Sequence, residues 1–178
     1  MKTERPKIPP PKMTRYGENK QSRQLSAVSF GGSTLNIEQQ PKKQYGYIPN
    51  KEGAGSQFQS TSDYGSMGVL AHNYLSGQRF FNMKQGDEVS ANYVGGGKSA
   101  GEQFEVAEIH RYQATNPNSQ TSSFVDLDTG EKLTFEQLYH NMYNENNPLV
   151  FQTCIERDGN NQWGRLFVVA RRKKPGKD

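Results

Sequence analysis

The chain has 178 residues and a formal net charge of +4, with 31% hydrophobic and 22% charged residues. The apolar share lies below the globular norm of about 45–50%, and the sequence shows neither an apolar run of about 18 residues nor a secretory h-region, so we expect no transmembrane segment and no signal peptide in it. A single cysteine excludes an internal disulfide and a multi-cysteine zinc site.

The ends of the chain are basic and its body is acidic. Residues 1–43 carry nine Lys/Arg and three Asp/Glu. Residues 44–170 carry eight Lys/Arg and fourteen Asp/Glu, and residues 171–178 carry five Lys/Arg and one Asp. We therefore predict a disordered basic N-terminal tail over 1–25, one domain over 26–170 and a basic C-terminal tail over 171–178. We interpret the tails as solvated ends of a monomer and expect no nucleic-acid partner.

In the first half of the chain the hydrophobic pattern favours short strands. Leu25, Val28 and Phe30 have strand-like spacing, and residues 44–49 (QYGYIP) resemble an edge strand ended by proline. Residues 50–66 are rich in Gly and Ser and are predicted to form a long loop. Residues 67–73 are predicted to begin as a buried strand, and 88–94 alternate as a half-buried strand does.

The second half contains a long strand, a helix and two final strands. Residues 103–114 form the long strand, whose alternation slips between Val106 and Ile109 and predicts a bulge. After turn-rich residues, Phe135, Leu138, Tyr139 and Met142 recur at helical spacing behind the candidate N-cap Thr134. Strands are predicted over 149–154 and 163–170. Many strands and one helix favour an antiparallel β-barrel or sandwich.

Three residues form a candidate catalytic set. Cys154 ends one predicted strand, His72 lies at the end of another, and Arg165 interrupts an apolar final strand where a charge requires a partner. An imidazolium beside a thiol stabilises the thiolate and donates a proton to a leaving amine. A guanidinium that binds the developing oxyanion contributes about 3–4 kcal/mol. Together these groups suit acyl transfer through a thioester, although a lone cysteine is more often a structural core residue.

The same residues resemble the motifs of the sortase family. His72 lies in Leu70-Ala-His-Asn, Cys154 in Phe151-Gln-Thr-Cys, and Arg165 in the segment 163–170 (WGRLFVVA), in the sortase order His, Cys, Arg. The turn at 81–87 (FNMKQGD) and the strand beginning at Gln103 are also similar to sortase segments. The resemblance covers about residues 45–170, and its most specific parts are the Thr-Cys and Arg strands.

The resemblance implies a mainly β fold, a closed sortase-type β-barrel of about eight strands with short helices. It also implies a bacterial cysteine transpeptidase that anchors surface proteins at the cell surface. Cys154 would attack an LPxTG-like sorting signal, and an amine from a cell-wall precursor or a pilin, or water, would resolve the thioester. His72 would be the general acid/base and Arg165 would hold the substrate and the oxyanion, while Ala71, Asn73 and Thr153 would line the groove. The segment before the cysteine strand would form the wall of that groove.

The sequence departs from the sortase pattern in two respects, and two alternative functions remain open. Val150 stands where many sortases have a small polar residue four positions before the cysteine, which leaves the subclass open, and the N-terminal anchor of most sortases is not recognisable. One alternative is a non-catalytic barrel that binds an extended peptide or a polyanion and has a structural cysteine. The other is a plain cysteine hydrolase.

No cofactor is expected. The histidines lack metal-ligand spacing, and His110 and His140 are interpreted as a strand residue facing solvent and a residue on the polar side of the helix. The resemblance implies one exception, calcium, which some sortases bind through acidic groove loops. The candidate ligands for it are Glu105, Glu108, Asp126 and Asp128.

Overall fold

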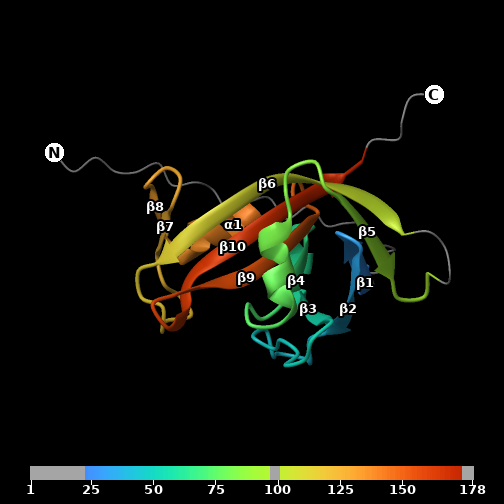
Figure 1. The fold of residues 1–178 in the computed structure, drawn as a ribbon, viewed down its shortest axis with the longest axis horizontal. Coiled ribbons are helices and arrows are strands. Elements are labelled where there is room, and N and C mark those ends of the chain that lie inside the picture. The colour runs from blue at the N-terminus through green and yellow to red at the C-terminus, as the bar shows by residue number, and fades with distance from the viewer. Residues whose placement is uncertain (1–22, 97–100, 174–178) are drawn as a thin grey trace.

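The computed structural model describes residues 23–96 and 101–173, which form a mainly β structure with short helices (Figure 1). The strands are β1 (Leu25–Phe30), β2 (Ser33–Gln39), β3 (Ala54–Phe58), β4 (Met67–Leu70), β5 (Glu88–Tyr93), β6 (Glu102–Ala114), β7 (Phe124–Asp126), β8 (Lys132–Leu133), β9 (Leu149–Arg157) and β10 (Asn160–Arg172). The α-helix α1 spans Phe135–Met142, and the 3-10 helices η1 and η2 span Gln59–Tyr64 and Ser76–Asn82.

The strands close into a barrel. Their order is β10-β9-β4-β3-β2-β1-β5-β6, and β10 also pairs with β6, which completes a ring of eight strands among the described residues. The strands β7 and β8 continue from β6 outside this ring. The prediction of a closed barrel of about eight strands is therefore confirmed. The long strands β6 and β10 run side by side across the molecule (Figure 1).

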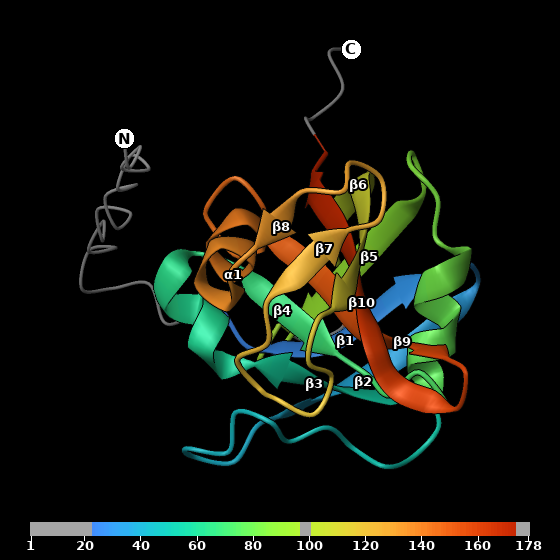
Figure 2. The same ribbon diagram turned by 90° about the vertical axis from the view of Figure 1, so that its left-hand side faces the viewer.

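The apolar side chains form two clusters, one on each face of β9 and β10. Leu166 and Val168 belong to the barrel interior, whereas Phe167 and Val169 belong to a second cluster that includes α1 residues and lies on the outer face. Strand β10 is apolar on both faces because α1 and β7–β8 cover part of the barrel wall. Figure 2 shows α1 beside η1 on one side of the barrel and η2 on the other.

The main errors of the sequence reading lie in residues 33–66. The polar stretch after Phe30 forms β2, residues 44–49 form turns instead of an edge strand, and the predicted loop 50–66 contains β3 and η1. Small residues stand in β3 because the barrel wall is crowded there: a Cβ at Gly55 would lie 2.8 Å from the Leu70 carbonyl oxygen. The small residues that resemble a loop composition are thus present because the strands pack closely at β3.

Two local predictions in the second half are confirmed. The register between β6 and β10 shifts between Val106 and Glu108, which is the bulge that the broken alternation indicated. Thr134 caps α1, and the reciprocal partner is Gln137 at the third helical position, so a full capping box is present.

The strands extend slightly beyond residues 26–170, the range over which a domain was predicted. Strand β1 begins at Leu25, which is fully buried, and β10 continues to Arg172. The predicted tails otherwise fall largely on residues 1–22 and 174–178, which lie outside the described residues. Within the described part, no helix has the length and apolar character needed to cross a membrane.

Candidate active site

Cys154 and Arg165 are direct neighbours across the β9–β10 ladder. Their Cα positions are paired in register, and both side chains project from the outer face of the barrel, opposite to Leu166 in the interior. Burial raises the pKa of the Cys154 thiol, and the positive charge of Arg165 acts in the opposite direction. The free cysteine is half-buried, so the thiol is not sealed in the core.

The guanidinium of Arg165 is fixed by its own strand. Its Nη1 donates to the carbonyl oxygens of Gln162 and Gly164, at 3.0 and 2.9 Å, and its Cζ lies 5.8 Å from the centre of the Phe124 ring. These contacts offset the cost of placing a charge on a mostly apolar strand. Among the hydrogen bonds of the described residues, none uses Nε or Nη2 of Arg165 as a donor.

His72 follows β4, whose parallel pairing with β9 sets its position. Leu70 pairs with Gln152, so His72 and Cys154 each lie two residues beyond this pair on neighbouring strands. The pairing continues past Leu70, because the Ala71 amide donates to the Gln152 carbonyl at 3.4 Å. The register therefore brings the predicted His, Cys and Arg positions to one end of three adjacent strands.

The imidazole of His72 packs against its own loop in this structure. It stacks on Tyr74, with ring centres 4.9 Å apart and planes 19° apart, and it hydrogen bonds to the backbone of Ile48. Burial lowers the pKa of His72 more than this hydrogen bond raises it. Among the contacts of the described residues, none joins the imidazole to the Cys154 thiol, so contact between them requires the side chain to turn.

The three residues predicted to line the groove lie in two different environments. Ala71 and Thr153 are only 2% and 3% exposed, and the Thr153 hydroxyl donates to the Ala71 carbonyl at 2.7 Å. Their side chains face the interior and join the ends of β4 and β9, which corrects the expectation that they contact substrate. Asn73 is half-buried and donates to the Asn161 carbonyl at 3.3 Å, which ties the His72 loop to β10.

Gly77 explains how closely the His72 loop approaches β9. A Cβ at Gly77 would lie 2.4 Å from Thr153 Oγ1 and 2.6 Å from the His72 carbonyl oxygen. The Gly77 amide donates to that same carbonyl at 2.9 Å. Only a glycine allows η2 to begin here, and its start fixes the backbone of His72.

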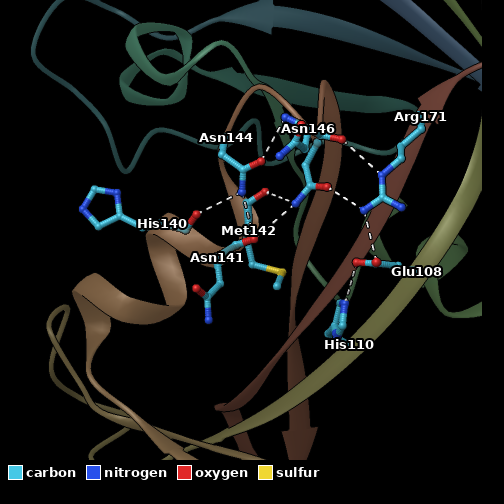
Figure 3. Close-up of polar contacts among 9 residues, drawn as sticks. Glu108, His110, His140, Asn141, Met142, Asn144, Asn146 and Arg171 are labelled. Atoms are coloured by element: carbon cyan, nitrogen blue, oxygen red, sulfur yellow. Dashed lines mark hydrogen bonds and ion pairs between the residues drawn. The ribbon is translucent and has the colours of Figure 1, made fainter. Parts of the chain in front are cut away.

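A network around Arg171 anchors the segment between α1 and β9 (Figure 3). Arg171 donates to the Asn146 carbonyl and the Asn147 side chain, at 3.1 and 3.0 Å, and forms an ion pair with Glu108. Glu108 also contacts His110 at 3.1 Å, so His110 belongs to this network on the barrel wall. Arg171, predicted to begin a solvated tail, therefore stabilises the segment that the resemblance assigns to the groove wall.

The four acidic residues considered for calcium are spread along the barrel wall. Asp126 pairs with Tyr112 on β6, and Glu105 lies seven residues earlier on that strand, about 23 Å away. Glu108 is engaged by Arg171 and His110. Among the described residues, no group of three His, Cys, Asp or Glu side chains is arranged to hold a metal ion.

Six of the thirteen Lys and Arg side chains of the described residues form ion pairs. Lys173 forms an ion pair with Glu88, and Arg172 and Arg23 both contact Glu102. A cavity of about 370 Å³ lies at the end of β3 that is remote from the His72 loop. Its lining contains one positive residue, Arg23, and one negative residue, Asp63. The uncharged lining residues are Gln24, Gln39, Tyr45, Gln57, Gln59, Ser60 and Ser62. The cavity lining thus has no excess of positive charge for a polyanion, and the basic tails lie largely outside the described residues.

The sequence reading gave no role to three residues around the candidate site, Tyr143, Gln152 and Tyr74. Tyr143, only 2% exposed, follows α1 and its hydroxyl donates to Oε1 of Gln152, which is two positions before Cys154 on the same face of β9. Tyr74 supports the His72 ring. The alternation of β9 was a usable signal for Gln152, because it places this polar side chain beside the thiol. Nothing in the local sequence linked Tyr143 to it.

Comparison with known proteins gives one consistent result. No protein-family model matches the chain, and no curated protein matches its sequence. Among solved structures, sortase C1 of Streptococcus agalactiae in complex with MTSET is 13% identical, with 89% of this chain and 73% of that chain covered and a TM-score of 0.51. Sortase C1 of Streptococcus suis is 12% identical, with coverages of 87% and 75% and a TM-score of 0.51.

Sortase C-1 of Actinomyces oris gives the same TM-score of 0.51, at 12% identity, with 84% of this chain and 71% of that chain covered. At such low identity the likeness concerns the fold, and it leaves the subclass open. Together with the closed eight-stranded barrel and the strand order, it shows that this chain has the sortase fold.

Proposed function

We propose that the protein is a sortase-type cysteine transpeptidase. It would cleave an LPxTG-like sorting signal through a thioester at Cys154 and transfer the acyl group to an amine, or to water. The observation that carries the proposal is the direct pairing of Cys154 with Arg165 on the outer barrel face, with His72 at the adjoining end of β4.

Each group has a defined role in this reaction. The Cys154 thiolate attacks the scissile carbonyl carbon, and Arg165 donates hydrogen bonds to the oxygen as it becomes negative. The tetrahedral intermediate collapses when the C–N bond breaks, and the His72 imidazolium gives its proton to the leaving amine. In the second half-reaction neutral His72 accepts a proton from the incoming amine or water, which attacks the thioester and releases Cys154.

The shifts in the pKa values of Cys154 and His72 determine which protonation state predominates before substrate binds. The Cys154 pKa is raised and the His72 pKa is lowered, so both groups are predominantly neutral near pH 7. The reactive pair of thiolate and imidazolium is then a minor population that is largest between the two pKa values. We expect a bell-shaped pH profile whose acid limb follows His72 and whose basic limb follows Cys154.

The partners and the location follow from the proposal. The substrate would be the sorting-signal peptide of a surface protein, and the acceptor would be an amine of a peptidoglycan precursor or a pilin. Such a reaction places the enzyme outside the cytoplasm, at the bacterial cell surface. The alternative, a non-catalytic peptide-binding barrel, would keep the fold and have an inert thiol.

A peptide-library assay tests the proposal. We expect the full chain to cleave a subset of LPxTG-type peptides and, with oligoglycine or a diamino acid added, to form the amide product as well as the hydrolysis product. Cys154→Ala should abolish both while the thermal transition is retained. Cleavage by the alanine variant, or an unreactive thiol with no cleavage in the parent, would contradict the mechanism.

A further inference from the structure

The pair Tyr143–Gln152 places a polar side chain on the outer face of β9, where Gln152 also accepts the hydrogen bond of the buried Tyr143 hydroxyl. Gln152 stands between Val150, which packs in the outer cluster, and Cys154, and its side chain is half-buried. Because side chains alternate along a strand, Gln152 and Cys154 project from the same face about 7 Å apart. The amide therefore lies next to the thiol on the candidate substrate surface.

Tyr143 is rigidly held. Its ring stacks on Phe58 with centres 5.8 Å apart and planes 3° apart, and it meets Phe167 edge-on at 6.2 Å. A Cβ at Gly68 would lie 3.1 Å from Tyr143 Cε1, so β4 has a glycine where this ring crosses it. Full burial raises the pKa of the Tyr143 phenol, which keeps it protonated and able to donate.

This rigid donor fixes the orientation of the Gln152 amide. The Tyr143 hydroxyl donates to Gln152 Oε1, so the carbonyl side of the amide is directed toward Tyr143 and Nε2 is directed away from it. None of the hydrogen bonds of the described residues uses Nε2 as a donor, and this nitrogen is not among the buried polar atoms without a partner. Two N–H donors in a defined orientation thus face solvent beside Cys154.

We propose that Gln152 is a specificity-determining residue. Its amide, oriented by Tyr143, donates a hydrogen bond to an acceptor side chain (Asn, Gln, Asp or Glu) of a peptide substrate, within two residues of the carbonyl that Cys154 attacks. The distance supports this range, because an extended peptide advances about 3.3 Å per residue. A bound peptide would displace water from these donors, so a side chain that leaves them unpaired would bind less tightly. The inference rests on the proposed function, which supplies the peptide substrate.

The test measures peptide binding without catalysis. Full-length protein with Cys154→Ala is titrated with fluorescent LPxTG-type peptides in which each of the two positions on either side of the scissile bond is Gln, Glu, Met or Lys. At one position we expect Gln and Glu to bind at least 10-fold tighter than Met and Lys. Gln152→Met should remove this preference, and Gln152→Glu, which replaces the donors by a carboxylate, should invert it in favour of Lys.

Two further variants separate recognition from folding and from overall charge. Tyr143→Phe keeps the ring and frees the amide, so the preference should fall to a few-fold while the thermal transition stays cooperative. Gln103→Glu introduces the same charge at an exposed position of β6 and should leave the preference unchanged. The ratio between peptides is the informative readout, because a merely structural change would weaken all peptides alike.

The outcomes distinguish this inference from the proposed function. An identical peptide ranking in the parent and in Gln152→Glu, or no peptide binding at all, would overturn the role of Gln152. If the ranking depends on residue 152 but the protein with Cys154 intact never cleaves the bound peptides, recognition stands and the proposed reaction fails. If cleavage occurs and ignores residue 152, the reaction stands and the recognition role fails.

Discussion

The two strand ends that meet at the candidate site are held in place by different means. Cys154 and Arg165 are fixed by backbone pairing within a continuous ladder of β9 and β10. His72 lies just beyond β4. Its position depends on the close approach of the following loop to Thr153 and on the stacking of its ring on Tyr74 within that loop. Register thus positions the thiol and the guanidinium, whereas packing positions the imidazole, which has to turn away from Tyr74 to contact the thiol.

The largest expected effect concerns the register-set pair. Arg165→Ala should lower the rate of acyl-enzyme formation about 10²–10³-fold, the cost of losing one preorganised oxyanion donor. It should also raise the Cys154 pKa further, because the neighbouring positive charge is lost, so the basic limb of the pH profile and the midpoint of thiol alkylation move to higher pH. Stopped-flow acylation and iodoacetamide labelling at several pH values measure the two effects.

Arg111→Ala is the matched control for this change, since Arg111 is an exposed arginine on β6. It should alter neither the acylation rate nor the alkylation midpoint. A downward shift of the midpoint in Arg165→Ala would mean that the guanidinium does not stabilise the thiolate.

A second change tests the packing that holds His72. Gly77→Ala inserts a Cβ against Thr153 Oγ1 and two backbone carbonyls, and this overpacking should cost about 1–3 kcal/mol of the free energy of unfolding. Displacement of the His72 backbone should also lower acylation. Chemical denaturation and the acylation assay give the two values.

Gly46→Ala serves for comparison, because no atom lies within 4 Å of the Cβ position at Gly46. It should change stability by less than about 0.5 kcal/mol. Equal stability of the two alanine variants would show that the loop yields at Gly77 and does not fix His72.

The smallest effect is expected at the ring that covers His72. Tyr74→Leu removes the stacked phenol, so the imidazole becomes more hydrated and its lowered pKa should rise toward the ordinary value. Because the acid limb follows His72, that limb should move to higher pH by the same amount. Proton NMR titration of the histidine ring reports the pKa directly.

Tyr45 has a similar exposure, 52% against 51% for Tyr74, and Tyr45→Leu provides the control. It should leave the His72 titration unchanged. An unchanged His72 pKa in Tyr74→Leu would place the cause of the lowered pKa elsewhere in the loop.

The sequence by itself determined the strands whose side chains alternate and the helix with its capping residue. It also determined the three positions whose chemistry suits a thioester mechanism. Cys154, Arg165 and His72 were recognisable because a lone thiol, an isolated charge on an apolar strand and a histidine at a strand end each break a hydrophobic pattern. Strand ends are local features, and a change in the local hydrophobic pattern of the sequence predicts where they occur.

Only the tertiary structure decided which segments share a face and how closely they approach. The Gly-rich residues of β3 looked like a loop because small residues serve both turns and crowded barrel walls. Ala71 and Thr153 were expected at the surface, but the parallel pairing of β4 with β9 turns them inward. Tyr143 meets Gln152 only because α1 folds back over β4 and β9, and such long-range packing leaves no periodic signal in the chain.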